Sequence, residues 1–393
     1  MSGDRPRAPL SRAARGKLAK LLAGASARVP LYRRLYAPLG LSPGDFRDPD
    51  ILAPLPVLTK ADLLAAPPAE RIDARWRPAD LAEEATTGST GQPFSVWIDR
   101  RYRARRNRRF LRALLAVGYR PWQRLMLLTD RYPGTVRRGR LHYVSVEQPT
   151  GAILEAYRRI RPHVLYGFAT PLRLLAERLG AEAAGGPRPR LVISTAEMLD
   201  TATREALERG FEAGVADFYG MTEMGLVAWR PAGISAYIMS PEAVVTEFVP
   251  DDSCPGRYRL LMTNLDLESS PIIRYDAGDL AVLDADGRVT AFEGRRLDTI
   301  VCRDGSELSP YRITDALRDI AGLRRFRVRQ CDTARIEVEA EAEPAVRGAV
   351  SAEIRGVFER LLGAGLGLEV TFRECLVPEG AAKFRPVVSE VPR

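Results

Sequence analysis

Residues 86–93 have the composition of a loop that could bind a polyphosphate. The first six residues of this loop are Thr86, Thr87, Gly88, Ser89, Thr90 and Gly91. Two glycines within four residues allow backbone N–H groups to turn inward, and the hydroxyl groups add further hydrogen-bond donors. The run is not a Walker loop, because Gln92 stands where a lysine would follow the last glycine, and it lacks the G-x-G-x-x-G spacing. An ordinary Gly/Ser/Thr turn is the alternative interpretation.

Three further turns could carry chemistry, because each follows a predicted strand. Short apolar strands (163–166, 191–195, 215–218) alternate with helices (172–179, 201–211), which predicts βαβ units and a mostly parallel sheet. Ligands bind such sheets beyond the carboxyl ends of the strands. The turns predicted there are Tyr166-Gly167, Thr195-Ala196-Glu197 and Tyr219-Gly220-Met221-Thr222-Glu223.

The elements around these turns predict an α/β fold with two domains. Residues 1–294 would form a large N-terminal domain with mostly parallel sheets and a β-rich subdomain. Residues 295–393 would form a small α+β C-terminal domain. The further predicted helices are 10–24, 30–39, 100–117, 311–320, 346–363 and one capped by Thr59, and the further predicted strands are 94–98, 124–129, 243–249, 256–262, 271–275, 279–283, 325–329, 335–340 and 368–373.

The composition is that of a globular protein outside the membrane. The chain of 393 residues is 46% hydrophobic and 28% charged, and it contains no apolar run long enough to span a bilayer. Its N-terminus lacks a signal-peptide core, and its four cysteines are scattered, so we expect neither a zinc site nor disulfides, and a cytoplasmic location.

The net charge of +9 raises the question of a nucleic-acid partner. The basic residues are spread along the chain, and only four of the 59 are lysines, namely Lys17, Lys20, Lys60 and Lys383. Their rarity indicates positions that favour a compact ammonium group. The arginine-rich segment 100–117 could be a nucleic-acid or membrane-surface helix. A solvated helix face is the favoured interpretation, because no aromatic residues are interleaved on its basic side.

Six motifs then occur in an order that resembles one enzyme superfamily. They are Thr86–Pro93, Thr195-Ala196-Glu197, Tyr219–Glu223, Arg274-Tyr275-Asp276-Ala277-Gly278-Asp279, Gly294-Arg295 and Lys383-Phe384-Arg385. Together they resemble the adenylate-forming ligases (acyl-CoA synthetases). Val29–Tyr32, Leu55–Lys60 and Asp304–Pro310 resemble the phenylacetate–CoA ligase branch in particular. The resemblance runs from about residue 28 to about residue 389.

The resemblance implies an ATP-dependent ligase for a carboxylic acid. Such an enzyme converts the acid to an acyl-adenylate with release of pyrophosphate and then transfers the acyl group to coenzyme A. ATP, Mg²⁺ and coenzyme A are therefore the expected cofactors, and a small carboxylic acid is the expected substrate. A mobile C-terminal lid domain and a monomeric or homodimeric protein are also expected.

The resemblance also implies roles for individual residues. The 86–91 loop would hold the β- and γ-phosphates, Thr222 would contact the α-phosphate, and Glu223 would hold Mg²⁺. Asp279 would accept hydrogen bonds from the ribose hydroxyls, Arg295 would touch the ribose or phosphate at the hinge, and Lys383 would neutralise the reacting groups. The nucleotide would be bordered by Thr195, Ala196, Glu197, Tyr219 and Gly220. Without the resemblance, Glu223 is a helix-N-terminal acid, Asp279 a turn residue, Tyr219 a core residue and Lys383 a tail lysine.

The pocket for the acid would involve Tyr143, Tyr166, Gly167 and Phe168, with His142 beside Tyr143. An aromatic-lined slot suits an aromatic acid, although the same side chains could simply form core.

Three departures from the family pattern leave alternatives open. Gln92 replaces a lysine, Leu297 replaces the first acid of the hinge, and Ala382 precedes Lys383 where glycine is usual. A ligase that passes its acyl group to an amine or a carrier protein is therefore one alternative. A basic nucleic-acid-binding protein without catalysis is another. A Ser–His–Asp hydrolase does not fit, because the chain has only two histidines and the spacing of Gly88-Ser89-Thr90-Gly91 is wrong.

Overall fold

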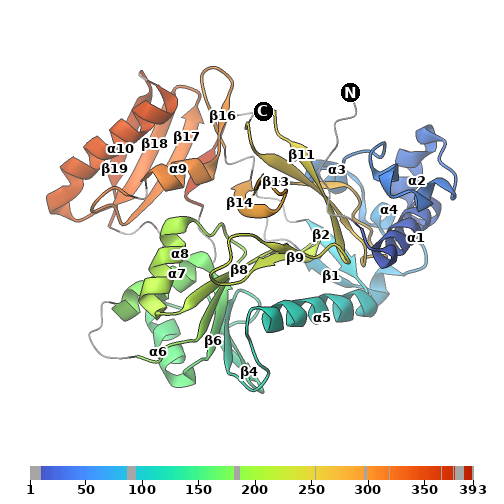
Figure 1. The fold of residues 1–393 in the computed structure, drawn as a ribbon, viewed down its shortest axis with the longest axis horizontal. Coiled ribbons are helices and arrows are strands. Elements are labelled where there is room, and N and C mark those ends of the chain that lie inside the picture. Colours follow the sequence, from blue (N-terminus) through green and yellow to red (C-terminus); the bar gives the residue numbers. More distant parts are fainter. Residues whose placement is uncertain are drawn as a thin grey trace.

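The computed structural model describes residues 10–85, 94–180, 186–252, 254–295, 299–317, 319–363, 365–374, 376 and 385–391. Within them, the chain is built around an eight-stranded sheet with the order β10-β9-β8-β7-β6-β3-β5-β4 (Figure 1). Strands β8, β7, β6, β3 and β5 run parallel, and the pairs at both edges are antiparallel. The mostly parallel sheet is thus confirmed. The strands are β3 (Leu125–Thr129), β4 (Thr135–Arg138), β5 (Leu141–Ser145), β6 (Val164–Phe168), β7 (Leu191–Thr195), β8 (Gly214–Met221), β9 (Gly225–Arg230) and β10 (Ile238–Met239).

Helices cover both faces of this sheet, because its central strands are apolar on both sides. On β3, Met126 and Leu128 belong to a core cluster with α6 (Thr150–Ile160), α7 (Ala169–Gly180) and α8 (Thr201–Phe211). Leu125 and Leu127 belong to a second cluster with α5 (Arg100–Ala116). This alternation points successive side chains to opposite faces, which fixes the face that each strand end presents to a ligand.

The β-rich part is a four-stranded antiparallel sheet in the order β11-β12-β13-β14. The N-terminal helices lie beside it, and the two share one hydrophobic core (Figure 1). The strands are β11 (Val244–Pro250), β12 (Tyr258–Asn264), β13 (Tyr275–Leu283) and β14 (Val289–Arg295). The helices are α1 (Arg12–Arg28), α2 (Pro30–Tyr36), α3 (Lys60–Ala65) and α4 (Pro68–Arg71), with 3-10 turns η1 (Ala37–Leu39), η2 (Asp45–Arg47), η3 (Pro49–Leu52) and η4 (Pro78–Asp80).

Two local features bear on the site. Thr59 caps α3, as the sequence predicts, and Asp62 completes a capping box. A strand that the sequence did not predict, β1 (Ala82–Ala85), pairs with β2 (Ser95–Ile98), so that Ala85 lies opposite Ser95. This pairing brings together the two ends of the 86–93 segment, which itself lies outside the described residues.

The C-terminal part has its own core between a four-stranded sheet, β19-β18-β17-β20, and two helices. In Figure 1 it lies on the opposite side of the molecule from α1 and α2. Its elements are β15 (Ile300–Val301), β16 (Glu307–Leu308), α9 (Pro310–Leu317), β17 (Arg325–Asp332), β18 (Arg335–Glu341), η6 (Pro344–Val346), α10 (Arg347–Leu362), β19 (Gly367–Phe372) and β20 (Val387–Ser389). The division into domains at residue 294 stays a prediction.

Three local predictions were wrong. Residues 271–274 are not a strand, because Arg274 adopts the left-handed region (φ 51°) while its side chain forms a buried ion pair with Glu247. The proposed turns at Tyr166-Gly167 and at Tyr219-Gly220-Met221 lie instead within β6 and β8, because both strands continue further than their apolar runs.

Among the described residues, no helix is both long and apolar enough to cross a membrane.

Candidate active site

A cavity of about 2280 Å³ opens at the carboxyl ends of the parallel strands. Its wall includes the ends of β6, β7 and β8, parts of β13 and β14, and residues of the C-terminal part such as Arg325 and Val387. Two contacts join that part to α7 at the rim. Arg173 donates a hydrogen bond to the Arg324 carbonyl at 2.9 Å, and Arg325 pairs with Glu177. A cavity of this size exceeds what most small ligands need, so it can hold two substrates together.

The end of β7 contributes Thr195, Ala196 and Glu197 to the wall. Ala196 has φ 64°, a left-handed conformation that is uncommon for a residue other than glycine and that turns the chain sharply after the strand. Glu197 then accepts a hydrogen bond of 2.6 Å from the backbone N–H of Thr170 in the first turn of α7. A carboxylate is stabilised at a helix N-terminus by unpaired N–H groups and the helix dipole.

Tyr219 on β8 reaches the neighbouring sheet. Its hydroxyl donates a hydrogen bond of 2.6 Å to Oδ2 of Asp279 on β13. Its ring stacks on Phe292 of β14, with centroids 3.7 Å apart and an interplanar angle of 11°. An aromatic surface thus stands next to a carboxylate on one wall of the cavity, a combination suited to a base and a vicinal diol.

Glu223 lies in the tight turn between β8 and β9, not at a helix N-terminus, so the alternative interpretation of this acid was wrong. It is only 7% exposed, yet it lines the cavity together with Thr222. Tyr275 contacts its Oε1 at 3.4 Å, and Asn264 donates a hydrogen bond of 2.8 Å to its carbonyl oxygen. Gly220 can have no side chain, because a Cβ there would lie 2.6 Å from the backbone oxygen of Gly225 on β9.

A cluster of aromatic rings also lines the cavity. Tyr166 and Phe218 are in edge contact with Phe110 of α5, at 5.4 and 6.0 Å between centroids. Tyr143 packs edge-on against Tyr132 at 5.0 Å, and both line the cavity. Burial raises the pKa of Tyr166 to about 12, so its phenol stays neutral at physiological pH.

Comparison with known proteins agrees with this geometry. Two relatives are phenylacetate–coenzyme A ligases. The one from Escherichia coli (strain K12) is 27% identical over 303 residues, covering 71% of this chain and 68% of the relative. The one from Thermus thermophilus is 25% identical over 312 residues, covering 71% of this chain and 66% of the relative. The chain therefore spans about two thirds of the length of these relatives. No family model matches the chain.

The fold matches a solved structure over most of both chains. A 2-hydroxyisobutyryl-CoA ligase in its postadenylation state, in complex with R3-HIB-AMP, has a TM-score of 0.77 at 20% identity over 96% of this chain and 89% of that chain. The chain thus shares the fold of this adenylate-forming ligase and is similar in sequence to the two phenylacetate–coenzyme A ligases. A second structure of the same ligase, with 2-HIB-AMP and CoA in the thioesterification state, matches 97% of this chain and 89% of that chain at 20% identity. Its TM-score is lower, at 0.61. Because one protein gives both values, the difference lies in conformation, and our chain is closer to the postadenylation form.

The structure brings most of the residues that the adenylate-forming pattern implied to this one cavity. Its walls include Thr195, Ala196, Glu197, Tyr219, Gly220, Thr222, Glu223, Asp279, Tyr143, Tyr166 and Phe168. Gly167 and His142 do not line it. Each alternates with a lining residue on its strand, and a Cβ at Gly167 would lie 2.7 Å from Leu128 on the other face.

Some implied residues cannot be placed. Thr86, Thr87, Gly88, Ser89, Thr90 and Gly91 lie outside the described residues, as does Lys383. Arg295 is described only through its backbone, which pairs with Asp279 between β14 and β13.

The sequence analysis missed a buried polar pair in the same cavity. Tyr237 donates a hydrogen bond to Asp217, and both side chains line the cavity. Burial raises the pKa of Asp217, although Tyr237 and two arginines act against that rise. Asp217 stands two residues before Tyr219 on β8, so strand periodicity could have found it, whereas nothing in the sequence marks Tyr237.

Proposed function

We propose that this protein activates a carboxylic acid with ATP as an acyl-adenylate and then transfers the acyl group to coenzyme A. The observation that carries the proposal is that one cavity is lined both by residues suited to bind a nucleotide and by a group of aromatic side chains. Tyr219, hydrogen-bonded to Asp279, is one of the residues suited to the nucleotide, and the buried Glu223 also faces the cavity. The relatives are named as phenylacetate–coenzyme A ligases, and the solved ligase binds an acyl-AMP.

In the first step, a carboxylate oxygen of the acid attacks the α-phosphorus, and pyrophosphate leaves. This chemistry depends mainly on alignment and charge neutralisation. Asp279 would orient the ribose through its two hydroxyl groups, while the Tyr219 and Phe292 rings border the base. Thr222 would donate to the α-phosphate, and Lys383 would neutralise charge as the bond to pyrophosphate breaks.

The donors near Glu223 suit magnesium, which prefers carboxylate and phosphate oxygens. Glu223 supplies a buried carboxylate, and the Thr222 hydroxyl is next to it in the chain. Bound Mg²⁺ would neutralise phosphate charge at this turn.

In the second step, the thiol of coenzyme A attacks the acyl carbonyl, and AMP leaves. The C-terminal part contributes Arg324 and Arg325 to the rim, where they contact Arg173 and Glu177 of α7. Any rotation of that part must break these contacts, so we propose that they hold the adenylation arrangement.

We further propose that the acid is aromatic. Phe110, Tyr143, Tyr166 and Phe218 line the cavity, and edge-to-face contact with an aryl ring is favourable by about 0.5–1.5 kcal/mol beyond burial. Three arginines of α5 make contacts within the protein: Arg106 pairs with Glu84, Arg105 with Asp266, and Arg109 donates to the Leu226 carbonyl. These three arginines therefore have a structural role, and the exposed arginines of the helix form a solvated face.

The test is acid-dependent pyrophosphate release from ATP and Mg²⁺ across aryl, arylacetic and short aliphatic acids, with and without coenzyme A. Release with an aromatic acid, stimulated by coenzyme A, supports the proposal. Release that an amine or a carrier protein stimulates instead would replace the acceptor. Lys383→Ala should abolish release, whereas Lys20→Ala, which changes a lysine of α1 paired with Glu268, should not. An inability to bind ATP would overturn the proposal.

A further inference from the structure

Glu223 lies in the tight turn between β8 and β9, which we call the Glu223 turn. The side chain of Asn264 connects this turn to the rest of the protein. Asn264 is the last residue of β12 and is completely buried. Its Nδ2 donates hydrogen bonds to the Glu223 carbonyl at 2.8 Å and to the Tyr102 hydroxyl at 2.9 Å. Its Oδ1 accepts a hydrogen bond from the backbone N–H of Asp266 at 3.2 Å. These three partners fix the orientation of the amide group.

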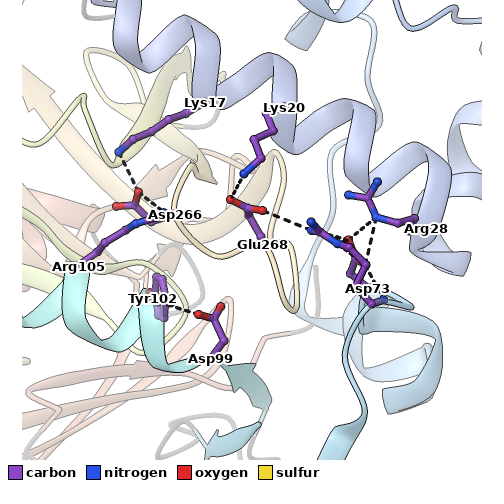
Figure 2. A network of polar contacts seen from close by, with 10 residues as sticks. Lys17, Lys20, Arg28, Asp73, Asp99, Tyr102, Arg105, Asp266 and Glu268 are labelled. Carbon is purple, nitrogen blue, oxygen red and sulfur yellow. Dashed lines mark hydrogen bonds and ion pairs between the residues drawn. The ribbon is translucent and has the colours of Figure 1, made fainter. Parts of the chain in front are cut away.

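A second set of contacts holds Asp266 itself (Figure 2). Its carboxylate is 4% exposed and accepts a hydrogen bond of 2.8 Å from Lys17 on α1, while Arg105 of α5 approaches to 3.6 Å. Lys17 also donates to the Glu242 carbonyl at 2.8 Å. The same loop is held next to this point by Lys20, which pairs with Glu268 at 2.8 Å. Two of the four lysines of the chain therefore fasten α1 to the loop that follows Asn264.

The Glu223 turn depends on contacts from outside its own hairpin. Within the hairpin, the turn is closed by a hydrogen bond of 3.3 Å from Met224 N–H to the Met221 carbonyl. The direction of the Glu223 side chain follows from the orientation of its peptide, and Asn264 holds the carbonyl of that residue. A buried carbonyl that loses its donor is costly, so the turn would shift to find another.

We propose that Asn264 is a positioning residue for the metal-binding carboxylate of Glu223, and that α1 supports it through Lys17 and Asp266. The proposal rests on the proposed function for the role of Glu223. Asn264 does not itself touch the metal. It acts as an outer partner that fixes a ligand, a type of contact whose loss commonly reduces metal affinity by about 10–100-fold.

The decisive variant is Asn264→Asp, which keeps size and the acceptor for Asp266 but directs a carboxylate oxygen at the Glu223 carbonyl. Its matched control is Ser269→Ala in the same loop, which also removes a buried hydrogen bond, of 2.8 Å to the Trp97 carbonyl. A second pair is Lys17→Ala against Lys20→Ala, because both lysines lie on α1 and bind carboxylates but only Lys17 leads to Asn264.

The measurement is calorimetric ATP binding at increasing Mg²⁺, with thermal unfolding and far-UV circular dichroism of each variant. We expect Asn264→Asp to raise the Mg²⁺ concentration at half-saturation about tenfold and Lys17→Ala to raise it several-fold, with metal-free ATP binding unchanged. Ser269→Ala and Lys20→Ala should leave the Mg²⁺ dependence at the wild-type value, even where they lower the melting temperature.

The outcomes separate this inference from the proposed function. Equal Mg²⁺ dependence in Asn264→Asp and Ser269→Ala would overturn the inference and leave the ligase proposal standing. If the wild type binds Mg²⁺ and ATP but releases no pyrophosphate with any acid, the ligase proposal is overturned. The binding assay still tests whether Asn264 positions Glu223. If Asn264→Asp does not fold, identical Mg²⁺ curves for Lys17→Ala and Lys20→Ala would overturn the inference. ATP binding by the wild type that does not change with the Mg²⁺ concentration would also overturn the inference.

Discussion

Replacement of Asp279 by asparagine should weaken ATP binding through the ribose specifically. Asp279 accepts a hydrogen bond of 2.6 Å from Tyr219, which uses one of the roughly four acceptor positions of a carboxylate. The proposed function assigns other positions to the 2′- and 3′-hydroxyl groups. Asparagine has nearly the same shape, so the change removes the charge and part of the acceptor capacity while it leaves the cavity in place.

The expected magnitude follows from the chemistry of those hydrogen bonds. A hydrogen bond to a charged group contributes about 1.5–3 kcal/mol, and asparagine retains one weaker acceptor. We therefore expect a net loss of about 2–3 kcal/mol, equivalent to about 30-fold to about 150-fold weaker ATP binding.

The assay is calorimetric binding of ATP, 2′-deoxy-ATP and 3′-deoxy-ATP to the wild type and to Asp279→Asn at saturating Mg²⁺. In the wild type, each deoxy analogue should bind more weakly than ATP. In Asp279→Asn this difference should shrink, because the partner of the missing hydroxyl is already weakened. Asp276→Asn is the control, since Asp276 lines the same cavity from the same strand but is bound by Arg259 at 2.6 Å.

Two results would refute the reasoning. An equal loss for ATP and both deoxy analogues in Asp279→Asn would show that Asp279 does not contact the diol. If Asp276→Asn weakens ATP binding as much as Asp279→Asn does, the effect comes from the negative charge in the cavity and not from the position of Asp279.

Three further predictions concern stability and local geometry. Arg274→Ala removes the buried ion pair to Glu247, so it should cost about 3–5 kcal/mol and lower the melting temperature. Arg274→Met combined with Glu247→Leu should recover only part of the loss, because the carbonyls of Ala53 and Leu55 still lose the donor that Arg274 supplies. Burial acts to raise the pKa of Glu84, but the hydrogen bonds and charge of Arg106 outweigh it and hold the pKa below the ordinary 4.5. The stability from Glu84 is therefore present above pH 4.5 and is lost as the pH falls through the lowered pKa, so the melting temperatures of wild type and Glu84→Gln should converge in acid but not at pH 7. Gly220→Ala places a Cβ 2.6 Å from the backbone of the facing strand, so it should weaken ATP binding, and a binding constant equal to that of the wild type would contradict the close approach.

Local sequence patterns predicted much of the framework. The parallel strands β3, β6, β7 and β8 and the helices α7 and α8 were found, because each is a short apolar run or an amphipathic segment bounded by turn residues. The Thr59 capping box was found for the same reason, since its two partners lie three residues apart. The strands β4, β5, β9 and β14 and the helix α6 were missed. Of these, β4 and β14 lie at sheet edges and carry more polar residues, so they resemble loops.

The candidate site was predicted through the order of its motifs, not through periodicity. Glu197, Tyr219, Glu223 and Asp279 were chosen from short segments that have little meaning alone. Asn264, Tyr237 and Phe292 were not chosen, because each belongs to an ordinary strand or loop and acts only through a partner distant in the chain. Asn264 lies 41 residues from Glu223, for example.

The sequence by itself determined the fold class, the resemblance to adenylate-forming ligases and most of the residues proposed to meet the nucleotide. Only the tertiary structure decided how they meet: Tyr219 binds Asp279 across 60 residues of sequence, Ala196 turns Glu197 toward α7, and α1 supports the Glu223 turn through Lys17. Backbone periodicity and caps are set by neighbouring residues, so a sequence shows them directly. Contacts between distant segments depend on packing and on the burial of polar groups, and these exist only once the chain has folded.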